Sequence, residues 1–510
     1  MKTKFIKSIN PKLVLLSLLF GIIFSWLIKD GITPLILAGK SFINRSFFIQ
    51  IAILILLVVC ISVFFFLILS VSFYAGNKTG WGIILLIFLS TQLVIYSMNQ
   101  PQISSGNGRG DDGVSYGRVA ELFLEGQSPE TSGPFVYRIG VPWLAHQITR
   151  LAGTLVDNSF RAINTFSVVS LIMLIYYLAL RDCSPWYAAL AAALYSIPFY
   201  SSTRQLFFYP VRVDPLWVFL MIAGLAIMTR KRITTISFLA LCLITFLATL
   251  IRETSIILPL SFLLSRYSVR RLVSLEMLLG YPVTRTSREN ETDNLRDLLM
   301  GFAMFSLFVG GFLFTHLVSI DTADYTFQNA ILTAIYQNGL WHLVVSFCLA
   351  YGGPLIALLV LEKHIVARYF QQYPEFLIFI VLILILSYIG GGNTVRFMAW
   401  ASPIVLILIC ACLESIMAKI HKMATKPKII LSTITTLCLV YSIIMVHPFD
   451  GYFSDYTAWA KWGGIQSSDI NSLTNILPNF LPCIVLMLFM VILWRWIGPQ
   501  GEENGLHFDP

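Results

Sequence analysis

Long apolar segments recur along almost the whole chain, and this feature restricts the possible folds more than any other. A helix needs about 20 apolar residues to cross roughly 30 Å of hydrocarbon. The sequence predicts fourteen membrane segments, at 13–28, 47–73, 81–98, 163–180, 186–200, 213–229, 233–250, 254–265, 299–317, 340–361, 375–390, 397–413, 429–446 and 476–496. The predicted fold class is therefore all-α, a polytopic α-helical membrane protein. Residues 233–265 also allow a bent hairpin, because its two short halves flank Arg252 and Glu253.

Composition supports this class and excludes several others. Apolar residues make up 57% of the chain and charged residues only 12%, whereas about 25% of the residues in soluble domains are charged. A soluble enzyme and a disordered chain are both excluded. The net charge is +9, but no run of five Lys or Arg residues suggests nucleic-acid binding. The eight cysteines lie in or beside apolar segments without metal-ligand spacing, and they predict neither disulfides nor a metal site.

Basic residues between the segments predict the orientation. If the fourteen segments alternate in direction, the basic clusters at 230–232, 266–271 and 419–428 all fall on one side. Cytoplasmic loops of membrane proteins are rich in Lys and Arg. We therefore expect both termini in the cytoplasm, a multi-pass integral membrane protein, and long outer connections. The basic start lacks a small-residue cleavage site, so segment 13–28 is expected to be retained.

The predicted organisation follows from these segments. It consists of N-terminal spans (1–98), an extracytoplasmic loop (99–162), central spans (163–265), a cytoplasmic loop (266–298), C-terminal spans (299–496) with outer loops 318–339 and 447–475, and a cytoplasmic tail (497–510).

Charged residues near the membrane segments collect on the predicted outer side. Ionisable groups in or beside membrane spans are costly, and so they are candidate functional residues. The candidates from this pattern are Asp111, Asp112, Asp214, Arg252, Glu253 and Arg396. No repeated pattern of charges occurs at mid-membrane, and this absence weighs against an ion-coupled transporter.

The outer loop 99–162 predicts two short amphipathic helices that lie flat on the membrane surface. In the first, at 114–126, Tyr116, Val119, Ala120 and Phe123 share one face. The second opens at Pro142 and closes at Gly153. Gly108, Gly110 and Gly113 match GxGxxG, but no strand precedes them, so nucleotide binding is not expected.

Several short motifs, taken in order, resemble a known family. They are Asp112-xxx-Tyr116, Gly126, Pro134-Phe135-Val136-Tyr137-Arg138, Pro142, Val213-Asp214-Pro215-Leu216, Arg252-Glu253, and Arg396-Phe397 with Pro403. Their order and sidedness are similar to those of the GT-C membrane glycosyltransferases of bacterial type. The resemblance covers roughly 80–415 and departs from the simplest members in having additional early spans.

The resemblance implies a GT-C-like fold and an inverting hexosyl- or pentosyltransferase of the bacterial plasma membrane. It implies a polyprenyl-phosphate-sugar donor, and an envelope glycan or a lipid-linked molecule as acceptor. The acceptor hydroxyl must lose a proton, which requires a carboxylate base, and the departing phosphate favours arginine. Asp112 is the predicted base, with Asp111 as the alternative. The predicted substrate-binding residues are Tyr116, Tyr137, Arg138, Arg252, Glu253, Arg396 and Asp214.

Other interpretations remain open at this point. Asp111 and Asp112 could cap a helix, Asp214 more readily so because it precedes Pro215. Arg138 could anchor the loop to lipid headgroups, Arg252 and Glu253 could form a structural ion pair, and Arg396 could snorkel to the interface. A divalent cation (Mg²⁺ or Mn²⁺) is left open as a cofactor. The rival functions are an oligosaccharide polymerase or ligase of surface-polysaccharide assembly, and a lipid or sugar flippase. The expected partners are the donor, the acceptor and membrane lipids, with no nucleic acid.

Overall fold

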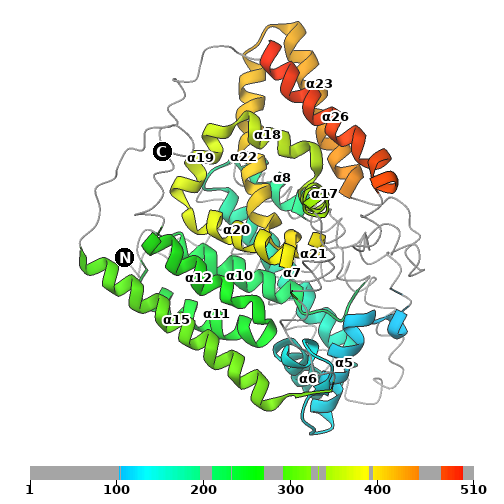
Figure 1. The fold of residues 1–510 in the computed structure, drawn as a ribbon, viewed down its shortest axis with the longest axis vertical. Coiled ribbons are helices and arrows are strands. Elements are labelled where there is room, and N and C mark those ends of the chain that lie inside the picture. Colours follow the sequence, from blue (N-terminus) through cyan, green and yellow to red (C-terminus); the bar gives the residue numbers. More distant parts are fainter. Residues whose placement is uncertain are drawn as a thin grey trace, which may run out of the picture.

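The computed structural model describes residues 103, 105–195, 209–230, 233–268, 291–322, 331, 340–389, 394–446 and 473–497. The predicted spans 13–28, 47–73 and 81–98 lie outside these residues, as do most of the loops 318–339 and 447–475 and of the tail 497–510. The described part is helical (Figure 1) apart from two strands of two residues, β1 (Glu130–Thr131) and β2 (Ile320–Asp321), which pair in parallel. The prediction of an all-α fold is therefore confirmed for this part of the chain.

Two short helices, α5 (Asp111–Leu124) and α6 (Gly140–Ala152), pack together at one end of the molecule (Figure 1). They match the two helices predicted in the loop 99–162, although each begins two or three residues earlier. Gly126 follows α5 with a positive φ of 73°, and Gly153 caps α6 with a φ of 63°. Glycine is favoured at such left-handed positions, so both predicted ends are confirmed.

Every predicted membrane segment that contains described residues corresponds to one or more helices. These helices are α7 (Val156–Ala179), α8 (Pro185–Tyr195), α10 (Asp214–Met228), α11 (Thr235–Ile251), η4 (Glu253–Ile256), α12 (Ile257–Leu263), η5 (Leu264–Ser268), α15 (Glu291–Val318), α17 (Leu340–Tyr351), η6 (Gly353–Leu355), α18 (Ile356–Leu361), α20 (Pro374–Ile389), α21 (Thr394–Met398), η7 (Ala399–Ala401), α22 (Ser402–His421), α23 (Thr425–Val446) and α26 (Leu473–Ile497). A further amphipathic helix, α19 (Lys363–Gln372), bends by 104° into α20.

Helix α22 forms the centre of the described fold. Nearly all of its side chains are buried, and α7, α8, α17, α18, α19 and α23 all contact it. A helix that is apolar on every side and packed by neighbours on every side belongs to the interior of a protein. The chain therefore builds its core around one long helix, and α21 and η7 lie directly before it.

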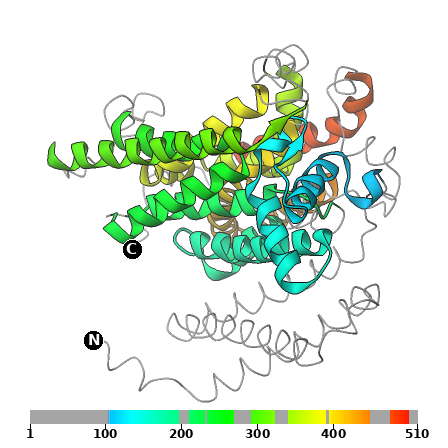
Figure 2. The same cartoon turned by 90° about the horizontal axis from the view of Figure 1, so that it is seen from below.

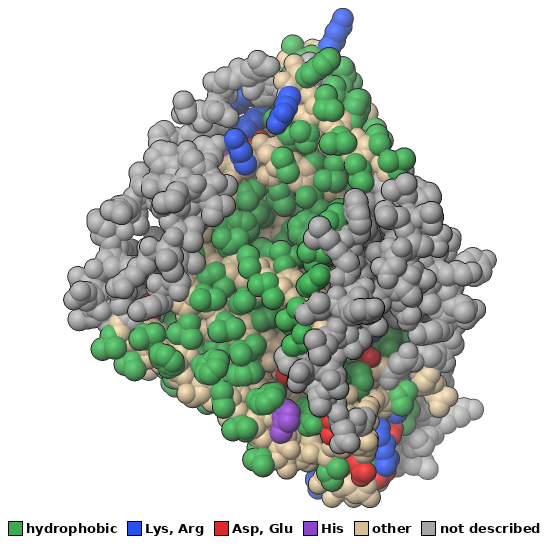
Figure 3. All heavy atoms as spheres, viewed as in Figure 1, with side chains coloured by type: hydrophobic (Ala, Val, Ile, Leu, Met, Phe, Trp, Pro, Cys, Tyr) green, Lys and Arg blue, Asp and Glu red, His purple; other side chains and the backbone are tan. Residues whose placement is uncertain are grey.

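Helices α11 and α15 lie side by side and present an apolar outer face, and Figure 2 shows them extending together away from α5 and α6. Large apolar side chains stay exposed on both helices, for example Ile236 at 80% and Leu317 at 84%. In Figure 3 this face is almost entirely hydrophobic, and charged side chains gather towards the two ends of the view. Such an apolar surface is typical of contact with lipid and indicates a membrane protein.

The described residues do not show fourteen full spans. Three helices are long and apolar enough to cross a membrane: Val156–Ala179, Leu295–Val318 and Thr394–His421; the bent pair α19–α20 would make a fourth. Other predicted segments are shorter or interrupted. Gly352, Gly353 and Pro354 separate α17 from α18, and an extended Arg252 ends α11. Glycine and proline interrupt helices without making a segment polar.

Two helices extend beyond the predicted membrane segments into predicted loops. Helix α15 begins at Glu291, inside the predicted loop 266–298, because Leu295 and Leu299 continue the helical spacing beyond the apolar run. Helix α7 begins at Val156, inside the predicted loop 99–162. Polar residues in a first helical turn lower the hydropathy of a segment but do not prevent the helix.

Candidate active site

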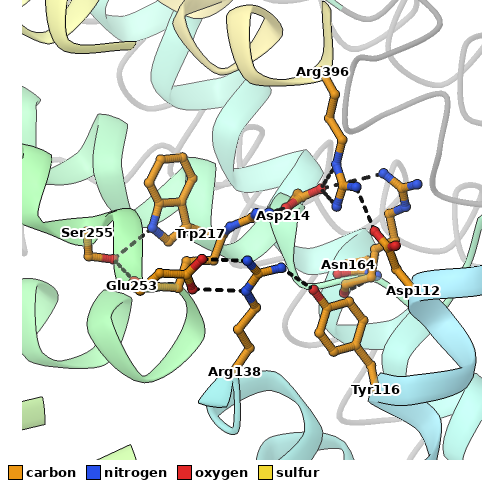
Figure 4. A network of polar contacts seen from close by, with 11 residues as sticks. Asp112, Tyr116, Arg138, Asn164, Asp214, Trp217, Glu253, Ser255 and Arg396 are labelled. Atoms are coloured by element: carbon orange, nitrogen blue, oxygen red, sulfur yellow. Dashed lines mark hydrogen bonds and ion pairs between the residues drawn. The ribbon is translucent and has the colours of Figure 1, made fainter. Parts of the chain in front are cut away.

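Most of the candidate residues meet in one polar cluster, although they come from five separate parts of the chain (Figure 4). We call this group the arginine cluster. It comprises Asp112 and Tyr116 of α5, Arg138 after η3, Arg212 and Asp214 at the start of α10, Arg252 and Glu253 between α11 and α12, and Arg396 of α21.

Asp214 is the centre of the cluster, and three arginines surround its carboxylate. Arg396 donates from Nε at 2.7 Å and places Nη2 2.5 Å from the same oxygen. Arg252 donates to the other oxygen, and Arg212 lies 3.6 Å away. The Asp214 side chain is only 5% exposed, and Asp214 is the first residue of α10, so that Val213 holds the N-cap position. The interpretation of Asp214 as a helix cap is therefore wrong.

Arg396 links Asp214 to Asp112. Its Nη1 donates to Asp112 Oδ2 at 2.7 Å, while its other two nitrogens face Asp214. The Arg396 side chain is buried, so the snorkelling interpretation is wrong as well. Burial raises the pKa of Asp112, but the attraction of Arg396 and then Arg212 outweighs it and holds this pKa below its usual range. Asp112 is therefore a carboxylate at neutral pH.

Arg138 forms a second, self-contained unit of the cluster. Its Nε and Nη2 donate to the two carboxylate oxygens of Glu253 at 3.0 and 2.5 Å, and its Nη1 donates to the Tyr116 hydroxyl at 2.9 Å. A planar guanidinium fits a carboxylate in this two-pronged way. The Arg138 side chain is buried, so it does not anchor the loop to headgroups.

The backbone at Arg252 explains how neighbouring charges reach different partners. Arg252 is extended, with φ −153° and ψ 137°, between α11 and η4. Successive side chains of an extended backbone point in opposite directions. Arg252 therefore pairs with Asp214, whereas Glu253 pairs with Arg138, and the interpretation of the two as one ion pair is wrong.

Aromatic and hydroxyl side chains hold the break at Arg252 in place. Trp217 Nε1 donates to Ser255 Oγ at 2.8 Å, and Ser255 Oγ donates to the Arg252 carbonyl at 2.7 Å (Figure 4). The Arg252 guanidinium also lies 4.5 Å from the ring centre of Trp400. A cation over an indole ring is stabilised by the ring quadrupole. These contacts fix the direction of the Arg252 side chain.

Two further residues of the site were not among the sequence candidates. Asn164 of α7 is fully buried and donates to the carbonyls of Pro210 and Arg212, at 2.9 and 3.1 Å. Arg212 lies 3.7 Å from the ring centre of Tyr209. Two features of the sequence could have indicated these residues. Asn164 is an amide within an apolar segment, and Arg212 is a charged residue two positions before Asp214. Asn164 and Tyr209 thus position the segment that leads into α10.

The glycine-rich run before α5 serves close packing. A Cβ on Gly110, whose φ is 69°, would meet the Tyr209 ring at 2.2 Å, and a Cβ on Gly113 would meet the Val211 carbonyl at 3.0 Å. Glycine lets the backbone approach another segment that closely. These glycines bring Asp112 within reach of the cluster.

Two candidates stay outside the network. Tyr137 donates to Asp321 Oδ2 at 3.1 Å and stacks on His316, with 3.9 Å between the ring centres. Its role in substrate binding stays a prediction. The side chain of Asp111, the first residue of α5, lies outside the described part of the structure.

The cluster carries an excess of positive charge. Among its described side chains, four arginines face three carboxylates. Each carboxylate already binds a guanidinium, so this donor set does not fit the Mg²⁺ or Mn²⁺ ion that the sequence left open. The described residues also contain no group of three or more His, Cys, Asp or Glu able to hold a metal. A buried surplus of cationic charge is costly unless an anion compensates it. The arrangement is thus chemically suited to bind an anionic group.

Comparisons with known proteins show similarity in fold only. No protein-family model matches the sequence, and no curated protein matches it. The oligosaccharyltransferase of Archaeoglobus fulgidus in its apo form is similar in structure, with a TM-score of 0.50, 12% identity, and coverage of 85% of this chain and 62% of that one. The present chain thus spans less than two thirds of that enzyme.

Two further solved structures are similar at lower scores. The oligosaccharyltransferase AglB of Archaeoglobus fulgidus, in complex with an inhibitory peptide and a dolichol-phosphate, has a TM-score of 0.48 and 11% identity over 84% of this chain and 61% of that one. ArnT from Cupriavidus metallidurans, bound to undecaprenyl phosphate, has a TM-score of 0.45 and 14% identity over 82% of this chain and 76% of that one. In fold, this chain is thus similar to the oligosaccharyltransferase of Archaeoglobus fulgidus.

Proposed function

We propose that the protein transfers a sugar from a polyprenyl-phosphate donor to an envelope glycan or a lipid-linked acceptor, on the extracytoplasmic face and with inversion. The observation that carries this proposal is the surplus of arginine over carboxylate in a buried cluster. A polyprenyl-phosphate sugar combines an anionic phosphate with an apolar tail. Such a donor matches a cationic cluster within a protein whose outer surface is largely apolar.

The proposed reaction is a single displacement at the anomeric carbon. The acceptor oxygen forms the new bond while the bond between that carbon and the phosphate oxygen breaks, and the bonding electrons leave with the lipid phosphate. Asp112 accepts the proton of the acceptor hydroxyl. Because attack and departure occur on opposite faces of the sugar, the configuration inverts.

The arginines differ in how readily they can serve the phosphate. Arg138 uses all three of its nitrogens on Glu253 and Tyr116, which suits a positioning role. Arg396 offers Nη1 on the side of the half-buried Asp112. The Nε of Arg252 has no hydrogen-bond partner among the described residues. We therefore assign the phosphate to Arg396 and Arg252, where guanidinium groups would stabilise the charge that develops on departure.

The fold also leaves a second candidate. The similar enzyme from Archaeoglobus fulgidus is an oligosaccharyltransferase, so the same cluster could serve the transfer of a whole oligosaccharide, as a ligase or polymerase does. The two proposals differ in what is added to the acceptor, which a mass measurement resolves.

The test is mass spectrometry of the surface glycans of a host that lacks the protein, carries it, or carries Asp112→Asn. We expect a mass difference of a single hexose or pentose that Asp112→Asn removes, because loss of a general base slows transfer by about 10²–10⁴-fold. Glu125→Gln is the matched control, since the Glu125 side chain pairs with the exposed Arg118 at 3.5 Å and with no residue of the arginine cluster.

Other results would decide against single-sugar transfer. A change in chain length with the same residue composition would favour the ligase or polymerase. No glycan difference in a host with a verified donor supply would refute the transferase and leave a flippase as the next hypothesis.

A further inference from the structure

We infer that Asp112 and the donor phosphate compete for the same nitrogen of Arg396, so that Asp112 is free to act on the acceptor only after the donor has bound. This inference rests on the proposed function. It adds an order of events to it: the donor phosphate first, release of Asp112 second, and acceptor activation third.

The first argument is the distribution of contacts around Arg396 (Figure 4). A guanidinium has three nitrogens, and here Nε and Nη2 both face Asp214, at 2.7 and 2.5 Å. Only Nη1 faces Asp112, at 2.7 Å. A phosphate that approaches Arg396 can thus replace Asp112 without disturbing the pairing with Asp214.

The second argument is that the two carboxylates differ in exposure and in support. The Asp214 side chain is 5% exposed and is also held by Arg212 and Arg252. The Asp112 side chain is 23% exposed, and it lies near the start of α5. Displacing Asp214 would leave several buried guanidinium groups without a carboxylate, whereas displacing Asp112 exposes it to water and to an incoming acceptor. Asp112 is therefore the partner that gives way.

The third argument is chemical. A carboxylate paired with a guanidinium has a lowered affinity for protons, and it is a weak base while the pair lasts. When the phosphodiester of the donor takes the same nitrogen, its negative charge neutralises the Arg396 charge beside Asp112. Its proton affinity then rises, at the moment when a donor is in place to react.

The test is the equilibrium binding of undecaprenyl phosphate to the purified full-length protein in detergent. If Asp112 competes with the phosphate, Asp112→Asn should bind this probe about threefold to tenfold more tightly than the wild type, the range expected for loss of a partly buried competing charge. The same substitution should abolish transfer, so that affinity and activity move in opposite directions. Glu125→Gln, which removes an equal charge outside the cluster, should bind as the wild type does.

Two further variants distinguish competition from simple repulsion between carboxylate and phosphate. Asp112→Ser removes the same carboxylate with a smaller side chain and should tighten binding likewise, even if the asparagine variant folds poorly. In an Arg396→Lys background the single ammonium is expected to stay with Asp214. The gain from Asp112→Asn should then disappear, because no shared nitrogen remains.

The outcomes separate this inference from the proposed function. Equal or weaker binding by both Asp112 variants would overturn the competition while leaving the transferase proposal intact. A gain that persists undiminished with Arg396→Lys would show repulsion and overturn it too. Failure of the wild type to bind undecaprenyl phosphate at all would refute the proposed donor, and the inference with it.

Discussion

The arginine cluster and a second buried ion pair lie at opposite ends of the same long helical segment, Thr394–His421. At its beginning, Arg396 joins Asp112 and Asp214. Near its end, Lys419 donates to both oxygens of Glu362, at 2.7 and 2.9 Å. The 23 residues between the two cations span about 34 Å of helix, close to the thickness of a membrane core.

The two groups differ in charge balance and in the support for their carboxylates. Glu362 is fully buried and pairs with Lys419, accepts a hydrogen bond from Ser415 at 3.2 Å, and has His364 Nε2 3.2 Å from one of its oxygens. This pair joins α18 and α19 to α22 and needs no further ion. The arginine cluster has more cations than carboxylates, and two of its carboxylates, Asp112 and Glu253, are partly exposed. A balanced pair serves as a structural joint, whereas an unbalanced cluster is suited to a ligand.

The largest expected effect is on transfer activity, which should depend on the arginine cluster and not on the Lys419–Glu362 pair. Arg396→Gln should lower sugar transfer per folded molecule by about 10²–10³-fold, since a charge that stabilises the transition state contributes that much. Lys419→Gln should leave transfer per folded molecule close to the wild-type value. Glycan yield divided by the amount of monodisperse protein measures both. Equal losses in the two variants would remove the functional distinction between the groups.

The next effect is on the free energy of unfolding, to which the Lys419–Glu362 pair should contribute strongly. Lys419→Met should destabilise the protein by about 3–5 kcal/mol, because it removes the ammonium group paired with the buried Glu362 carboxylate and leaves only Ser415 and the half-exposed His364 beside it. Lys422→Met, which changes an exposed lysine on the same helix end, is the control. Thermal unfolding in detergent measures the difference. If the pair is only a joint, the double variant Glu362→Met with Lys419→Met should recover most of the loss.

A smaller effect concerns the packing that brings Asp112 to the cluster. Gly113→Ala places a methyl group 3.0 Å from the Val211 carbonyl and should destabilise the protein by about 1–3 kcal/mol. It should also tighten binding of undecaprenyl phosphate, because α5 must shift and Asp112 then moves away from Arg396. Gly310→Ala meets nothing within 4 Å and should be neutral or slightly stabilising. Unchanged binding with Gly113→Ala would mean that the position of α5 does not affect the cluster.

The smallest effect is a pH dependence within the cluster. Burial raises the pKa of Glu253, but Arg138 outweighs it and lowers that pKa to about 2. A group with a lowered folded-state pKa stabilises the fold above its unfolded pKa and loses this contribution as the pH falls through the folded value. The stability gap between the wild type and Glu253→Gln should be constant from about pH 8 to 5 and shrink below about pH 4.5. A gap that does not change down to pH 3 would contradict the assigned pair.

Much of the fold could be predicted from hydropathy, because burying or lipid-covering apolar segments dominates in such a chain. The interruptions could not, since Gly352 and Pro354 alter the backbone without changing the apolar character of 340–361. The early starts of α7 and α15 were missed for a related reason. Helix formation extends into polar residues, whereas a hydropathy signal ends with them.

The site could be predicted as a set of residues but not as a set of pairs. Charges are rare in an apolar chain, so Asp112, Asp214 and Arg396 were conspicuous. Their pairing spans up to 284 residues of sequence, and no local pattern encodes it. Arg252 and Glu253 illustrate the limit, because only the extended backbone at Arg252 sends the two side chains to different partners.

The 284 residues between Asp112 and Arg396 also have a consequence for biogenesis. During synthesis, Asp214 can meet Arg212 and Arg252 as soon as α11 has been inserted, but Asp112 gains its guanidinium partner only when α21 leaves the ribosome. A chain that stops before α21 would keep a paired Asp214 and an uncovered Asp112. The cluster can therefore be completed only after nearly 400 residues have been synthesised, when the helical segment that begins at Thr394 emerges.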